Sequence, residues 1–85
     1  MEIKYSKRFL KQLKKSPKKI QKTFIQRQDL FVQDTSHPIL RNHSLSGRFK
    51  NFYSINITGD WRALYEKDGD EIVIFGLIRT HSQLY

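Results

Sequence analysis

The sequence contains no cysteine, and its 85 residues include half as many acidic side chains as basic ones. Without cysteine, the chain forms no disulfide, no thiolate metal site and no thiol nucleophile, which fits a reducing compartment. The longest apolar run, residues 72–78, is far shorter than the roughly 18 residues of a membrane span and suits a buried strand. The opening Met-Glu-Ile-Lys-Tyr lacks the apolar segment of a signal peptide. These absences predict a cytoplasmic protein without a membrane segment.

The length of the chain indicates one domain, which we place at residues 1–85, with a small core. The net charge is +8, and residues 1–33 carry all of it, because they hold ten Lys or Arg and two acidic residues. A one-sided basic surface attracts polyanions. The sequence leaves three explanations open: contact with nucleic acid or the ribosome, contact with an acidic protein, or a helical face that is only solvated.

The first half of the chain predicts a short strand followed by two helices. Residues 2–5 alternate polar and apolar, and a helix is expected at about 7–15 with Ser6 as its N-cap. Ser16 and Pro17 suit the N-cap and first position of a second helix, which runs to about residue 33. Apolar residues at helical spacing are expected to face the core: Phe9, Leu10, Leu13, Ile20, Phe24 and Phe31.

The second half predicts three strands. Residues 34–44 are rich in turn-forming and polar residues and indicate an exposed loop. Strands are expected at about 49–57, 61–67 and 71–79, joined by tight turns. The order β-α-α-β-β-β implies an α+β fold, in which an N-terminal helical hairpin packs on one face of an antiparallel sheet. The other face is then available for a site.

Two histidines, a carboxylate and a phenol are the groups best suited to proton transfer near neutral pH: His43, Asp60, His81 and Tyr85. Each also has a structural explanation, as a loop, turn or terminal residue, and a terminal tyrosine ring can also stack on a base. Trp61 is either a core residue or a lid at the sheet edge. Together with His37, the histidines lack the close spacing of a metal site, so we expect no metal or other cofactor.

Three segments, in this order, resemble the RelE superfamily of bacterial toxins and, within it, the YafQ branch. They are His-Ser-Leu-Ser-Gly at 43–47, Gly-Asp-Trp-Arg at 59–62 and Thr-His-Ser-Gln-Leu-Tyr at 80–85. The N-terminal strand and the lysine-rich helical hairpin also fit, so the resemblance spans nearly the whole chain. Three positions depart from the pattern. Asn56 stands where the branch has a further histidine, Arg79 where the family usually has glycine, and Ser44 where it has proline.

The resemblance implies the toxin of a type II toxin–antitoxin pair, with a small acidic antitoxin, the ribosome and mRNA as partners. Such toxins cut mRNA, usually in the ribosomal A site, without a metal. The 2′-hydroxyl attacks the adjacent linkage and leaves a 2′,3′-cyclic phosphate and a 5′-hydroxyl. The family's catalytic positions carry over as His43, Asp60, His81 and Tyr85, the last replacing phenylalanine.

Within that chemistry, His81 is expected nearest the leaving group, while Asp60 or His43 takes the 2′-proton or orients the group that does. RNA contacts are expected from a further set of residues: Lys50, Asn56, Trp61, Arg62 and Arg79. Two other functions stay open. One is a ParE-like toxin that acts on gyrase without cleaving RNA, although that branch generally lacks the Thr-His ending. The other is a basic module that binds RNA or the ribosome without cutting.

Overall fold

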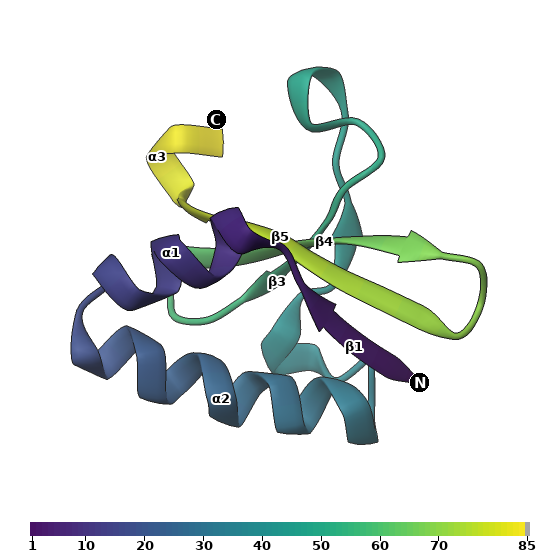
Figure 1. The fold of residues 1–85 in the computed structure, drawn as a ribbon, viewed down its shortest axis with the longest axis horizontal. Coiled ribbons are helices and arrows are strands. Elements are labelled where there is room, and N and C mark those ends of the chain that lie inside the picture. Colours follow the sequence, from purple (N-terminus) through teal and green to yellow (C-terminus); the bar gives the residue numbers. More distant parts are fainter. Residues whose placement is uncertain (85) are drawn as a thin grey trace.

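The computed structural model describes residues 1–84, so the prediction for Tyr85 lies outside the described residues. It contains a five-stranded sheet in the order β1-β5-β4-β3-β2 (Figure 1). The elements are, in chain order, β1 (Glu2–Tyr5), α1 (Lys7–Lys15), α2 (Lys18–Gln33), the 3₁₀ turn η1 (Pro38–Leu40), β2 (His43–Ser44), the 3₁₀ turn η2 (Gly47–Phe49), β3 (Tyr53–Asn56), β4 (Trp61–Asp68), β5 (Ile72–Thr80) and α3 (His81–Leu84). The predicted α+β class is therefore confirmed.

The structure differs from the prediction in three respects. β1 pairs with β5 in parallel, so the sheet is mixed rather than antiparallel. The segment predicted as an exposed loop contains η1, whose Leu40 is fully buried, and the short strand β2. Both elements are two or three residues long, too short to produce a periodic pattern. β3 also begins at Tyr53 rather than near residue 49, because η2 and the positive φ of Asn51 (81°) bend the preceding chain.

The helical hairpin follows the prediction in its bounds, but its linker differs. Ser6 caps α1 by accepting a 3.0 Å hydrogen bond from the Phe9 N–H. Ser16, however, ends α1 instead of capping α2, and its hydroxyl donates to the Gln12 carbonyl at 2.8 Å. A residue before proline favours extended backbone, and Ser16 has a ψ of 157°. Pro17 consequently stands at the N-cap, and α2 begins one residue later.

The core lies between the helical hairpin and one face of the sheet. Figure 1 shows α1 and α2 running in opposite directions beside the sheet. Leu10 is 49% exposed and the prediction for it was wrong, since Phe9 and Leu13 turn to the sheet and Leu10 points away. Apolar side chains from both layers form one buried cluster: Phe9, Ile20, Phe24, Phe31, Leu40, Ile55, Ile57, Ala63, Tyr65, Val73, Phe75 and Ile78.

The side chains that alternate with this cluster point to the other side of the sheet, called here the second face. Directly paired residues of neighbouring strands share a face, and Asn56 pairs with Arg62, which pairs with Arg79. His43 pairs with Ser54 and lies on the same face. The second face therefore gathers polar and basic side chains near the ends of β3, β4 and β5. In the described part of the chain, no helix is long and apolar enough to cross a membrane.

Candidate active site

A hollow of about 310 Å³ on the second face is lined by five polar side chains from five segments of the chain. Four of them were singled out from the sequence, and the fifth, Arg41, was not. The turn η1 brings Arg41 close to the other four residues, and the sequence did not predict that turn. The lining residues are Arg41, His43, Asn56, Arg62 and His81.

His43 is oriented by a hydrogen bond of 2.7 Å between its Nδ1 and the carbonyl oxygen of Arg41. A carbonyl only accepts, so Nδ1 carries the proton, and in the neutral ring Nε2 is the basic nitrogen. Arg41 has a φ of 47°, a left-handed conformation that residues other than glycine seldom adopt. The 3.3 Å bond from its N–H to the Pro38 carbonyl closes η1 and helps to hold this conformation. The turn thus fixes the tautomer of the histidine that follows it.

His81 stands at the junction of β5 and α3, next to the turn between β3 and β4. Its N–H donates to the carbonyl of Asp60 at 2.7 Å, and Thr80 N–H donates to Gln83 Oε1 at 2.8 Å. These two bonds fix where β5 ends and α3 begins. Asp60 therefore supports His81 through its backbone. Its own side chain is exposed and is not part of the hollow's lining.

Arg62 brings a nearly buried cation to the hollow, since only 9% of it is exposed. Its Nη1 donates to the carbonyls of Thr58 at 3.0 Å and Gly59 at 3.1 Å, both in the β3–β4 turn. Within residues 1–84, the one ion pair joins Lys4 to Glu2, so no described carboxylate neutralises Arg62. A buried cation without an acidic partner favours an anion in the space beside it.

Arg79 lies beside this hollow rather than in its lining. Burial, followed by repulsion from Arg8 and Arg48, lowers the pKa of Arg79 below its usual value. A guanidinium remains charged at neutral pH, so the crowding strengthens the local positive potential. Its Nη1 donates to the carbonyl of Ile78 at 2.9 Å.

Two further residues predicted to contact RNA lie elsewhere. Trp61 packs against the core, on the face that the helices cover, which is the structural alternative that the sequence left open. Lys50 is exposed just after η2 and does not line the hollow. Neither residue lines the hollow, and both RNA contacts stay predictions.

The hollow combines two imidazoles with two guanidiniums and an amide. One histidine can accept a proton while the other donates one, and the arginines can neutralise a phosphate between them. Asn56 can hydrogen-bond a phosphate oxygen but cannot carry a proton at neutral pH. Across residues 1–84, no three His, Cys, Asp or Glu side chains group as metal ligands. The arrangement suits acid–base chemistry at a phosphodiester.

Solved bacterial toxins share this fold. The structure matches YafQ from E. coli strain BL21(DE3) with a TM-score of 0.78 and 22% identity over 99% of this chain and 97% of that chain. It matches a chain of the E. coli DinJ–YafQ toxin–antitoxin complex with a TM-score of 0.76 and 23% identity, over 99% and 96%. For the YoeB dimer from Staphylococcus aureus the TM-score is 0.74 and the identity 19%, over 95% and 97%.

A family model described as the YafQ bacterial toxin of type II toxin–antitoxin systems matches residues 1–85. Comparison with curated proteins gave no match. The chain belongs to the YafQ family of bacterial toxins, which confirms the resemblance seen in the sequence.

Proposed function

We propose that this toxin is an endoribonuclease that cuts mRNA on the ribosome and so inhibits translation. The observation that carries the proposal is the hollow on the second face, where two histidines meet two arginines that have no described acidic partner. The YafQ family match over the whole chain supports the same activity. Attack by the 2′-hydroxyl on its own linkage needs a base, an acid and positive charge at the phosphate, and no resident metal.

In this reaction one histidine acts as the base and the other as the acid. His43 holds its proton on Nδ1, so the Nε2 of the neutral ring is the atom that takes the proton of the 2′-hydroxyl. His81, held at the start of α3, protonates the leaving 5′-oxygen. The products are a 2′,3′-cyclic phosphate and a 5′-hydroxyl. Asp60 and Tyr85 remain candidate catalytic residues.

Positive charge at the phosphate comes from Arg62 and Arg41. Arg62 is held by turn carbonyls and keeps its position without help from substrate, so it is preorganised for the charge of the transition state. Asn56 adds an amide hydrogen bond to the same phosphate. In this arrangement Asn56 contributes binding rather than proton transfer.

We further propose that the toxin acts in the cytoplasm and is neutralised by a cognate antitoxin protein. Complexes of DinJ with YafQ and of YefM with YoeB are known among its structural relatives. An acidic antitoxin would complement the net charge of +8 and compete for the same basic surface.

The proposal is tested by mapping mRNA ends after incubation with translating ribosomes. Wild-type protein should give cuts in phase with codons, and the His81→Ala variant should give none. His37→Ala serves as the control, because His37 caps η1 and does not line the hollow. If folded wild-type protein produces no cuts, the proposed activity is wrong, and action on gyrase or binding without cleavage becomes the better explanation.

A further inference from the structure

A second basic hollow, of about 680 Å³, lies near the first one, since Arg79 in its lining pairs with Arg62 in the lining of the first. Its lining consists of Arg48, Phe49, Arg79, Ser82 and Gln83. Arg48 lies over the Phe49 ring at 5.2 Å from the centroid, and its Nη2 reaches the Gln83 carbonyl at 3.5 Å. Together with the bond from Arg79 to the Ile78 carbonyl, these contacts hold two guanidiniums at one surface depression.

The charge of this second hollow is not balanced by the described part of the protein. Neither Arg48 nor Arg79 forms an ion pair within residues 1–84. Arg8, at the start of α1, adds further repulsion to Arg79. The repulsion between like charges that lack a counter-charge is relieved when an anion lies between them. The second hollow is therefore arranged for an anion.

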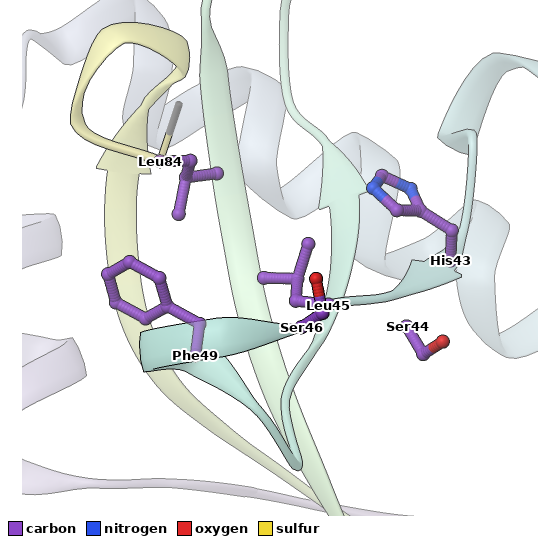
Figure 2. A pocket seen from close by; sticks show the side chains of 6 residues that line it. All are labelled: His43, Ser44, Leu45, Ser46, Phe49 and Leu84. Carbon is purple, nitrogen blue, oxygen red and sulfur yellow. The ribbon is translucent and has the colours of Figure 1, made fainter.

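A third, smaller hollow of about 270 Å³ lies between the two basic ones, shares one lining residue with each and is called here the connecting hollow. His43 lines both this hollow and the first, and Phe49 lines both this hollow and the second. Figure 2 shows His43 on one side and Phe49 with Leu84 on the other, while Leu45 lies between them. The connecting hollow is thus partly apolar, and each of its ends opens toward cationic side chains.

We propose that Arg48 and Arg79 bind the RNA phosphate next to the one that is cleaved. The inference rests on the proposed function, since it extends the same RNA strand from the first hollow into the second. A strand of RNA alternates phosphates with riboses that each carry a flat base. A base in the connecting hollow would therefore place the phosphates on its two sides near the two basic hollows. An acidic protein segment would match the two basic ends but not the apolar centre between them.

The test compares variants of the protein on RNAs that differ at one linkage. Synthetic mRNAs carry either an ordinary phosphate or a neutral methylphosphonate at the linkage on one side of the cut site, with a 2′-O-methyl group at that nucleotide in both. Cleavage rates on ribosomes are measured for the wild type and for the R48Q/R79Q double variant. The K18Q/K22Q variant loses the same charge from exposed positions of α2 and is the matched control.

At one of the two linkages that flank the cut site, the methylphosphonate should lower the cleavage rate of the wild type and of K18Q/K22Q by roughly tenfold or more. This is the loss expected when a charge-assisted contact is removed. R48Q/R79Q should already be slow and should lose nothing further. Thermal unfolding of the variants confirms that they are folded.

Equal losses in wild type and R48Q/R79Q at both linkages would overturn the inference while leaving the cleavage activity intact. The inference is also wrong if R48Q/R79Q cleaves normally and only its affinity for the antitoxin falls, because the arginines would then serve the protein partner. Failure of the wild type to cut the unmodified mRNA would instead overturn the proposed function, and the inference with it.

Discussion

His43 and His37 differ in which way their Nδ1 hydrogen bond runs. His43 Nδ1 donates to the Arg41 carbonyl, whereas His37 Nδ1 accepts a 3.2 Å bond from the Ile39 N–H. When both rings are neutral, they are therefore opposite tautomers. In the neutral His43 ring the basic nitrogen is Nε2, while in His37 the basic nitrogen caps η1. This contrast fits the proposed role of His43 as a base and the structural role of His37 in η1.

Replacing His43 with asparagine should keep a polar side chain of moderate size but remove the proton acceptor. We expect His43→Asn to slow single-turnover mRNA cleavage by roughly 10²- to 10⁴-fold, the usual contribution of a positioned acid or base. Asparagine is a good N-cap, so His37→Asn should cleave at nearly the wild-type rate. Equal rates for His43→Asn and the wild type would remove His43 from the mechanism.

Tyr65 carries a buried phenol whose hydroxyl donates to Asn42 Oδ1 at 2.8 Å. Burial raises the pKa of Tyr65 above its usual 10, and Tyr53 adds to the rise. Because the pKa of the phenol is higher in the folded state, its contribution to the free energy of unfolding is complete below about pH 10 and is lost as the pH rises further. Tyr65 is thus one source of alkaline unfolding.

The Tyr65→Phe variant should lower the free energy of unfolding by about 1 kcal/mol at pH 7, because Asn42 loses its partner. Above about pH 10, its unfolding free energy should fall less steeply than that of the wild type, since the phenol no longer ionises on unfolding. Urea unfolding at several pH values measures both effects. An unchanged alkaline slope would show that the Tyr65 ionisation is not coupled to folding.

β5 contains one residue more than the stretch of β4 with which it pairs. Leu64 pairs with Leu77 and Tyr65 pairs with Phe75, so Gly76 is the extra residue of a bulge. A Cβ on Gly76 would lie 3.1 Å from the Phe52 ring, and the Gly76 carbonyl accepts a bond from the Ser6 hydroxyl. The bulge changes the alternation of β5 and places Arg79 on the second face. The bulge therefore decides which side chains of β5 face the core and which face the site.

We expect Gly76→Ala to destabilise the protein by about 1–3 kcal/mol, because the Phe52 ring must move to admit a methyl group. Gly59→Ala is the control. Nothing lies within 4 Å of its added Cβ, and its backbone is not left-handed. Chemical denaturation compares the two variants. If both lose the same stability, the close approach of Phe52 is not what requires glycine at position 76.

The elements that the sequence predicted well are those with a repeated pattern. α1 and α2 were recognised because apolar residues recur over two to four turns, and β4 and β5 because they are eight and nine residues long. β2, η1 and η2 have two or three residues each and carry no such signal. The parallel pairing of β1 was missed because pairing depends on tertiary structure, not on the strand's own residues.

At the scale of the whole molecule, the site is assembled from segments that lie up to forty residues apart in the sequence. His43, Asn56, Arg62 and His81 were found because their residue types and the family resemblance pointed to them. Arg41 and Arg48 were missed, since only η1 and η2 bring them to the second face. Trp61 was expected among the RNA contacts, yet its side chain packs with the core. Residue type can suggest chemistry, but register and turns decide which side chains meet.

We expect the lysines of α2 to contribute to RNA binding and not to the chemical step. Lysines of α2 such as Lys18 and Lys22 lie outside the lining of the three hollows and are exposed. The K18Q/K22Q variant should therefore lower kcat/KM by a few-fold at low salt and reduce its salt dependence, with kcat unchanged. Cleavage kinetics at several salt concentrations measure this. A large fall in kcat would show that these lysines act in the chemical step.

The first hollow is proposed to promote attack by the 2′-hydroxyl of the RNA on its own adjacent phosphodiester. The most direct measurement places a single 2′-deoxynucleotide at a mapped cut site in mRNA on translating ribosomes. We expect cleavage at that site to disappear, while the all-ribose mRNA is cut to a 2′,3′-cyclic phosphate and a 5′-hydroxyl. Cleavage that continues at the deoxy site, or a 5′-phosphate on the product, would contradict it.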